Sequence, residues 1–271
     1  MKKKLLAIDL DGTALNNQSL LSEHTIDTLK KVSQNGHHVA IVTGRPYRLA
    51  LDFYRQLELD SPMVNFNGSL VVLPEKEWAG ERQAIIERDL VFEILARKQQ
   101  YSIDFLSAEN KDHFYVDNFQ HFEPTFFGAT AFSEDNKLTP FNMRINPNSI
   151  LVKINESMEK QKAASQIRAD YGNHLDIHPW GGPNPILELV PKGVHKAFGV
   201  DILADYYGIQ MTDVLAFGDE VNDLSMLQQA GFSVAMKNAR EEIQAVADDV
   251  TDWTNDEDGL ANYIVNRLKL A

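Results

Sequence analysis

The chain has 271 residues, no cysteine, and 39 acidic against 26 basic side chains, so its formal net charge is −13. The lack of cysteine excludes a disulfide-stapled scaffold. Hydrophobic residues at 44% and charged residues at 24% are typical of a soluble globular protein, and the length predicts about two domains.

The charge and the hydropathy pattern also limit the partners. No apolar run approaches the roughly 18 residues of a membrane span, and Asp9 and Asp11 interrupt the short apolar run that follows the basic N-terminus. We therefore expect a cytoplasmic protein with no membrane partner. The acidic balance argues against a nucleic-acid partner, because binding a polyanion requires a basic surface.

The first part of the chain alternates predicted strands and helices. In chain order these are a buried strand at 5–8, a helix at about 22–34, a second buried strand at 39–42 and a second helix at about 46–57. Ser22 is a candidate N-cap of the first helix, and Gly36 stands just past its end. This alternation is typical of a parallel α/β sheet.

The alternation changes in the middle of the chain and returns near its end. The middle holds strand candidates at 102–105, 150–154 and 186–189 and helical stretches at about 90–99 and 156–171. After it come a helix with one face formed by Phe198, Ile202, Leu203 and Tyr206, a strand at 214–217, another helix, and a strand at 232–235. We therefore predict a discontinuous α/β core, 1–80 with 190–271, and an inserted α+β domain, 81–189.

Four polar segments carry the candidate chemistry, and the first is Asp9-Leu10-Asp11-Gly12-Thr13, directly after the opening strand. Strand alternation sends the Asp9 and Asp11 side chains the same way, at the carboxyl end where open α/β sheets bind ligands. Two carboxylates on one face repel each other unless a cation lies between them, and Mg²⁺ prefers oxygen ligands. The pattern predicts a magnesium site, with a simple Asp-capped turn as the alternative.

The second and third segments offer groups for an anion. Thr43-Gly44-Arg45 follows the second strand and precedes a helix, so a hydroxyl, a helix N-terminus and a cation suit phosphate oxygens. Lys192 and Lys196 stand four residues apart at a predicted helix start, where two cations oppose the helix dipole and indicate a nearby anion. Alone, an N-capped turn and a solvated charged surface explain the two segments as well.

The fourth segment, Gly218-Asp219-Glu220-Val221-Asn222-Asp223, follows the predicted strand at 214–217. A helix beginning here would place Asp219, Asn222 and Asp223 on one side, which supplies a further metal ligand.

Together, the four segments predict phosphoryl transfer. Asp9 would be the nucleophile on phosphorus, and Mg²⁺ would reduce the charge repulsion. Asp11 would protonate the leaving alkoxide and then deprotonate water for hydrolysis of the aspartyl phosphate. Thr43 and a lysine would hold the phosphoryl oxygens.

These segments resemble the four motifs of the haloacid dehalogenase (HAD) superfamily of phosphotransferases, and the insertion resembles the C2 cap of its Cof-type sugar phosphatases. The resemblance spans essentially the whole chain and is most specific at the first and fourth segments. It implies a Rossmann-like parallel-sheet core with an inserted α+β cap. It also implies a Mg²⁺-dependent phosphatase that acts on small phosphorylated metabolites, chiefly sugar phosphates, through an aspartyl phosphate.

The resemblance further implies the metal ligands. Asp9, Asp219 and the main-chain carbonyl of Asp11 would bind the ion, while Asp223 would lie behind these ligands without binding it.

It implies the substrate contacts as well. Thr43 and Gly44 would contact the phosphate, and Asn222 would approach the substrate. By its spacing from the fourth segment, Lys196 matches the lysine of the family motif, with Lys192 as the alternative.

Two further segments have a possible role in the inserted cap. Residues 178–183, His-Pro-Trp-Gly-Gly-Pro, form the candidate substrate loop, since Trp180 can stack on a sugar face; a plain cap turn is the alternative. Asn65-Phe66-Asn67-Gly68 resembles the family's turn towards the cap, and its Asn67-Gly68 pair also predicts a hairpin turn.

Two other functions remain open at this point. A phosphotransferase or mutase would use the same aspartyl phosphate but keep the phosphoryl group on an isomeric product. A noncatalytic regulator would bind phosphorylated metabolites without turnover, and Asp11 argues against it because binding needs no acid or base.

Overall fold

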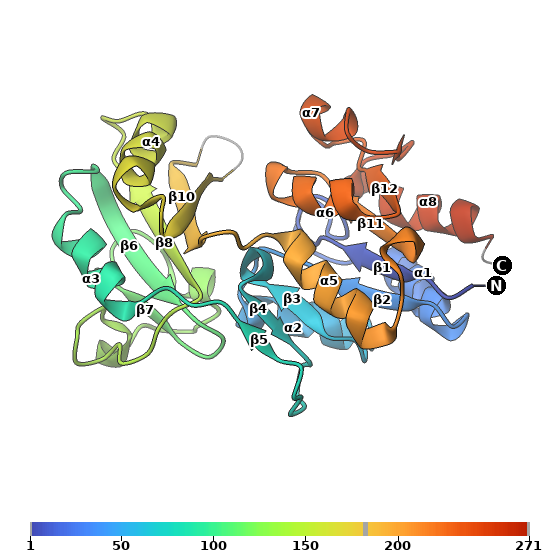
Figure 1. Ribbon diagram of the computed structural model, residues 1–271, viewed down its shortest axis with the longest axis horizontal. Coiled ribbons are helices and arrows are strands. Elements are labelled where there is room, and N and C mark those ends of the chain that lie inside the picture. The colour runs from blue at the N-terminus through green and yellow to red at the C-terminus, as the bar shows by residue number, and fades with distance from the viewer. Residues whose placement is uncertain (1, 181–183, 270–271) are drawn as a thin grey trace. The chain divides into compact units, whose positions relative to one another are not determined.

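The computed structural model describes residues 2–180 and 184–269. The chain divides into two compact units (Figure 1). The first comprises Met1–Arg45, Ala50–Arg82 and His195–Ala271, and the second comprises Pro46–Leu49 and Gln83–Val194. Among the described helices, none has both the length and the apolar character that crossing a membrane requires.

A five-stranded parallel sheet, in the order β13-β12-β11-β1-β2, forms the centre of the first unit. Its strands are β1 (Leu5–Ile8), β2 (His38–Ile41), β11 (Val214–Gly218), β12 (Phe232–Ala235) and β13 (Asp249–Val250). All four residues of β1 are buried, as expected of a central strand in a parallel sheet with both faces covered.

The register of this sheet brings distant segments together. Ile8 at the end of β1 pairs with Phe217 of β11 on one side and with Ile41 of β2 on the other. The chain leaves all three strands at the same edge, so the segments that begin at Asp9, Thr43 and Asp219 lie next to one another.

The helices of this part of the chain are α1 (Glu23–Gln34), α2 (Tyr47–Gln56), α5 (Lys196–Tyr207), α6 (Leu224–Gln229), α7 (Glu241–Gln244) and α8 (Gly259–Leu268). The predicted N-cap of α1 is confirmed, because the Ser22 hydroxyl accepts a hydrogen bond from the Thr25 N–H at 3.0 Å. Helix α1 packs against α8, and α5 packs against α6 on the near side of the sheet in Figure 1.

The apolar face predicted for α5 is buried only in part, at Leu203. Phe198 and Tyr206 are 42% and 43% exposed. The buried positions are Lys196, Ala197, Gly199, Val200, Leu203 and Ala204. The reason is that Lys196, the first residue of the helix, turns inward to two carboxylates. Gly199 then lies so close to Val64 that an added Cβ would stand 2.4 Å from a Val64 methyl.

A short hairpin follows α2. Strands β3 (Met63–Asn65) and β4 (Leu70–Val72) are antiparallel, and β5 (Arg82–Gln83) lies next to β4. The predicted turn at Asn67-Gly68 is confirmed, but its backbone is unusual. Phe66, Asn67 and Gly68 have φ values of 49°, 54° and 108°, in the left-handed region that favours glycine.

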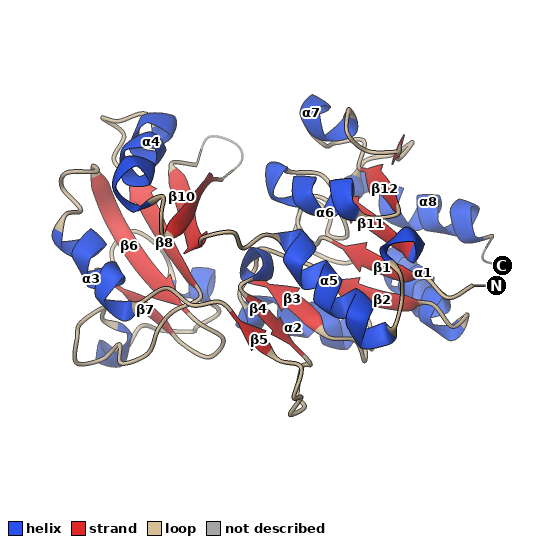
Figure 2. Cartoon of the chain, viewed as in Figure 1, coloured by secondary structure: helices blue, strands red, loops and turns tan. Residues whose placement is uncertain are grey.

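The second unit is built on an antiparallel sheet in the order β7-β6-β8-β10-β9. Its elements are α3 (Arg88–Ala96), β6 (Ile103–Glu109), β7 (Phe114–Val116), β8 (Ser149–Ile154), α4 (Lys160–Tyr171), β9 (Leu175–Pro179) and β10 (Ile186–Pro191), as drawn in Figure 2. The predicted helix at 156–171 begins later, at Lys160, because the Asn155 side chain accepts the Ser157 N–H and makes a turn there.

The two faces of this sheet have different neighbours. Ile150, Val152 and Ile154 share a core with buried residues of α3 and α4. Phe105 on the other face belongs to an aromatic cluster with Phe114 and Phe127. Phe127 is 1% exposed and is therefore a core residue of this cluster.

Candidate active site

Asp9 lies directly after β1 and is 4% exposed. Its N–H donates to the Phe217 carbonyl at 3.1 Å, which continues the sheet by one residue. The next turn needs glycine at position 12, where φ is +75° and an added Cβ would stand 2.2 Å from Oδ2 of Asp219. This turn therefore brings the first and fourth polar segments into contact.

Lys196 joins two carboxylates in the interior. It begins α5, after His195 as N-cap, and its side chain is fully buried. The Nζ atom lies 2.6 Å from Oδ1 of Asp9 and 2.6 Å from Oδ1 of Asp223. Burial lowers the pKa of Lys196, but the charges of Asp223 and Asp9, and the hydrogen bonds that the ammonium donates to them, raise the pKa by more, so the ammonium stays protonated.

The loop after β11 folds back on itself. Oδ2 of Asp223 accepts the N–H groups of Asp219 at 3.0 Å and Glu220 at 3.1 Å. Residues Val221–Asp223 form a short 3-10 turn before α6, so the helix expected to begin at Asp219 is not formed. The oxygens of Asp219 and Asp223 still lie within 4.8 Å of each other. The two N–H groups that donate to Asp223 fix the loop instead, so that the Asp219 side chain lies beside Asp9.

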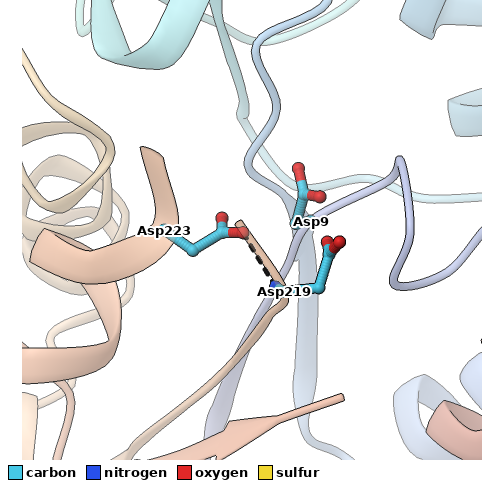
Figure 3. Close-up of side chains that lie close together, drawn as sticks. All are labelled: Asp9, Asp219 and Asp223. Carbon is cyan, nitrogen blue, oxygen red and sulfur yellow. Dashed lines mark hydrogen bonds between the residues drawn. The ribbon is translucent and has the colours of Figure 1, made fainter. Parts of the chain in front are cut away.

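Three carboxylates meet at this point. One oxygen from each of Asp9, Asp219 and Asp223 lies within 4.8 Å of the others. Figure 3 shows the carboxylates of Asp9 and Asp219 next to each other, with a hydrogen bond from the Asp219 N–H to the carboxylate of Asp223. The Thr13 hydroxyl donates to Oδ1 of Asp219 at 3.1 Å.

The protonation of these groups fits a cation site. Burial raises the pKa of Asp9 well above its usual value, against the lowering effect of Lys196, and the neighbouring carboxylates add to the rise. Burial and the charge of Asp223 raise the pKa of Asp219 to about 7. A hard cation bound by Asp9 and Asp219 would relieve both effects. Asp223 already has Lys196 on one oxygen and two N–H groups on the other, so it fits a supporting position.

Arg45 and Asp11 form an ion pair that the sequence did not reveal. Arg45 Nε lies 2.7 Å from Oδ2 of Asp11, and its NH2 atom lies 2.5 Å from Oδ1. The guanidinium also lies over the Phe53 ring, 5.2 Å from its centroid. The only sequence signal was the cation at the end of the second polar segment, and its spacing gave no partner.

The second polar segment is placed at the same sheet edge. Thr43 is fully buried, and its Oγ1 accepts the Arg45 N–H at 3.1 Å. Asn67 lies against Gly44, since an added Cβ on that glycine would stand 3.2 Å from both amide atoms of Asn67. The Asn67 Oδ1 in turn accepts a hydrogen bond from Asn222 Nδ2 at 3.0 Å.

The two candidate lysines differ in their surroundings. Lys192 precedes α5, is 55% exposed, and pairs with Asp176 at 2.5 Å within the second unit. Only Lys196 of this pair contacts Asp9.

The candidate substrate loop is described in part. His178 and Pro179 end β9, and the Trp180 ring lies 6.2 Å from the Phe126 ring. Residues 181–183 of that loop lie outside the described part of the chain.

Comparison with known proteins identifies the family of this chain. Residues 6–264 match the family of haloacid dehalogenase-like hydrolases. The chain is 33% identical over 273 residues to the 5-amino-6-(5-phospho-D-ribitylamino)uracil phosphatase YitU of Bacillus subtilis, with 99% of each chain covered.

Solved structures give the same result. A haloacid dehalogenase-like hydrolase from Bacteroides thetaiotaomicron superposes with a TM-score of 0.82 at 26% identity, covering 98% of this chain and 100% of that one. A HAD subclass IIB sugar phosphatase shares the fold, with a TM-score of 0.81 at 22% identity and 99% and 100% coverage. The chain belongs to the haloacid dehalogenase-like hydrolases, as a phosphomonoester hydrolase, and it has the fold of the subclass IIB sugar phosphatase.

Proposed function

We propose that this phosphatase hydrolyses its substrates with Mg²⁺ at the carboxyl edge of β1 and β11, through a phosphoryl group carried on Asp9. The observation that carries the proposal is the contact of Lys196 Nζ with Asp9 Oδ1 at 2.6 Å, beside the carboxylate of Asp219. The arrangement combines a fixed nucleophile, a permanent cation and an oxygen-ligand metal site.

The reaction divides into two transfers. In the first, a carboxylate oxygen of Asp9 forms a bond to phosphorus, the ester bond breaks, and Asp11 gives its proton to the leaving alkoxide. In the second, the Asp11 carboxylate takes a proton from water as the water oxygen bonds to phosphorus. The Asp9–phosphorus bond then breaks, and inorganic phosphate leaves with Asp9 restored.

The remaining residues are proposed to bind the metal ion and to position the charged groups. Asp9, Asp219 and the main-chain carbonyl of Asp11 would hold Mg²⁺, which when bound neutralises charge between these carboxylates and the phosphoryl oxygens. Lys196 lowers the pKa of Asp9 against the effect of burial, holds its carboxylate in position, and would stand next to the transferring group.

Thr43 and Gly44 are proposed to contact the phosphate, and Asn222 the substrate. The position of Thr43 supports this proposal. Its hydroxyl lies between the end of β2 and the start of α2, and the N-terminus of a helix favours anions.

For the substrate, we propose a phosphate ester at the end of a short polyhydroxylated carbon chain, as in a sugar or sugar-alcohol phosphate. Support comes from the relative that is 33% identical over nearly the whole chain, whose named substrate carries a 5-phospho-D-ribityl group. The ribityl group is a five-carbon polyol, and it shares a primary phosphate and a row of hydroxyl groups with the sugar phosphates.

A substrate panel tests this function. It would contain the phosphoribitylaminouracil compound, pentose and hexose phosphates, glycerol phosphate and an aryl phosphate, each assayed for inorganic phosphate with and without Mg²⁺. We expect Mg²⁺-dependent release of phosphate, highest with the polyol esters. Retention of the phosphoryl group on an isomeric product would instead indicate a mutase, and binding without turnover would indicate a regulator.

A further inference from the structure

The turn between β3 and β4 has a backbone that is costly for its sequence. Phe66 and Asn67 are consecutive residues with φ of 49° and 54°, and neither is glycine. Such conformations persist only where the surroundings enforce them, and they concentrate at functional sites. Asn67 is also 5% exposed, so its side chain is held in the interior and not in solvent.

Backbone hydrogen bonds tie this turn to the proposed phosphate loop. The Asn67 N–H donates to the Thr43 carbonyl at 3.1 Å, and the Phe66 N–H donates to the Arg45 carbonyl at 3.3 Å. The Asn65 side chain donates to the same Arg45 carbonyl at 3.1 Å. The left-handed backbone therefore places the Asn67 side chain beside Gly44.

The Asn67 side chain then reaches the fourth polar segment. Its Oδ1 accepts the Asn222 Nδ2 hydrogen at 3.0 Å. The Oδ1 of Asn222 is buried and has no hydrogen-bond partner among the residues that the structure describes. A buried acceptor of this kind is costly unless a donor arrives.

We propose that Asn67 is a positioning residue that fixes the amide of Asn222, so that Asn222 offers its oxygen to a hydroxyl group of the bound substrate. This inference rests on the proposed function. A phosphate oxygen is itself an acceptor and cannot pair with Asn222 Oδ1. The donor chemistry that fits is a hydroxyl group of a polyol substrate.

The test uses Asn67→Gly, because glycine adopts the observed backbone without strain while the side chain is lost. We expect kcat/KM to fall about tenfold, the equivalent of one hydrogen bond. The melting temperature should stay within about 3 °C of the wild type, since the relief of strain offsets the lost contact. Ser19→Gly is the matched control, as an exposed residue with φ of 58° elsewhere in the first unit.

A double-mutant cycle with Asn222→Ala separates this role from a structural one. If Asn67 acts through Asn222, adding Asn67→Gly to Asn222→Ala lowers kcat/KM no further. The inference would be overturned if the losses of kcat/KM in the two single variants multiplied in the double variant. A fall in melting temperature that parallels the loss of activity would also overturn it. If Asn67→Gly has wild-type activity while Asn222→Ala is impaired, the inference about Asn67 is wrong but the proposed function stands. Wild-type activity of Asn222→Ala would remove Asn222 from the proposed function as well.

Discussion

Arg45 binds both carboxylate oxygens of Asp11, with Nε to Oδ2 at 2.7 Å and NH2 to Oδ1 at 2.5 Å. The Asp11 side chain is 54% exposed and the Arg45 side chain 22%. The arginine is therefore the better anchored partner, and it determines where the proposed acid and base stands before substrate arrives.

This pair predicts an effect that depends on the leaving group. Arg45→Ala should lower kcat about tenfold for an alkyl phosphate, because a freely rotating Asp11 delivers its proton less often. For 4-nitrophenyl phosphate the change should be under about twofold, since that phenolate leaves without a proton. Steady-state kinetics on both esters measure this.

Arg55→Ala is the control for that experiment. Arg55 lies in α2, and it makes two hydrogen bonds to the carboxylate of Glu75, at 3.0 and 2.5 Å. We expect no change with either ester. Equal losses on both esters for Arg45→Ala would show that Arg45 does not act through Asp11.

Asp9→Asn should abolish phosphate release. The amide keeps the shape of the side chain but is a far weaker nucleophile than the carboxylate. Phosphate assays together with circular dichroism would check that the activity is lost while the fold remains. Turnover at the wild-type rate would remove Asp9 from its role.

Lys196→Met should abolish activity and also lower stability. Its removal leaves Asp9 and Asp223 without their buried cation, and losing one partner of a buried pair costs about 3–5 kcal/mol. Urea unfolding measures the free energy. Lys192→Met is the matched control, because that lysine is 55% exposed and should change neither quantity much. If Lys192→Met were the more harmful change, the assignment of the lysines would have to be reversed.

The metal site predicts a pH dependence of stability. Asp219 has a folded pKa of about 7 against 3.8 for the ordinary group, so the folded state binds its proton more tightly than the unfolded state. Without metal, the free energy of unfolding should therefore fall as pH rises from about 4 to about 7. Mg²⁺ should restore the most stability near pH 7, where the carboxylate is ionised.

Thermal unfolding in EDTA and in Mg²⁺ across this range measures the effect. Asp219→Asn should flatten the profile without metal, and Asp219→Ala should sharply raise the Mg²⁺ concentration needed for activity. An unchanged metal titration would remove Asp219 from the ligands.

The parts of the fold that follow from local patterns could be predicted from the sequence. The apolar run of β1 and the carboxylates after it identify one sheet edge, and Ser22 marks the start of α1. The inward face of α5 could not be predicted, because burial of a lysine depends on carboxylates from β1 and from the loop after β11.

The same limit applies to the site. Asp9 and Asp219 could be proposed as neighbours, because parallel strands deliver their ends to one edge. The Arg45–Asp11 pair joins segments 34 residues apart, and the Asn67–Asn222 bond joins segments 155 apart. Contacts between such distant segments leave no local pattern in a single sequence, so they could not be predicted from it.

The most direct test of the central claim is a crystal structure of the protein with Mg²⁺ and beryllofluoride, which mimics a phosphoryl group on a carboxylate. We predict that beryllium is bonded to a carboxylate oxygen of Asp9, with Mg²⁺ held between Asp9 and Asp219 and the Lys196 ammonium against a fluoride. An adduct on another residue, or Mg²⁺ bound away from these carboxylates, would contradict the account.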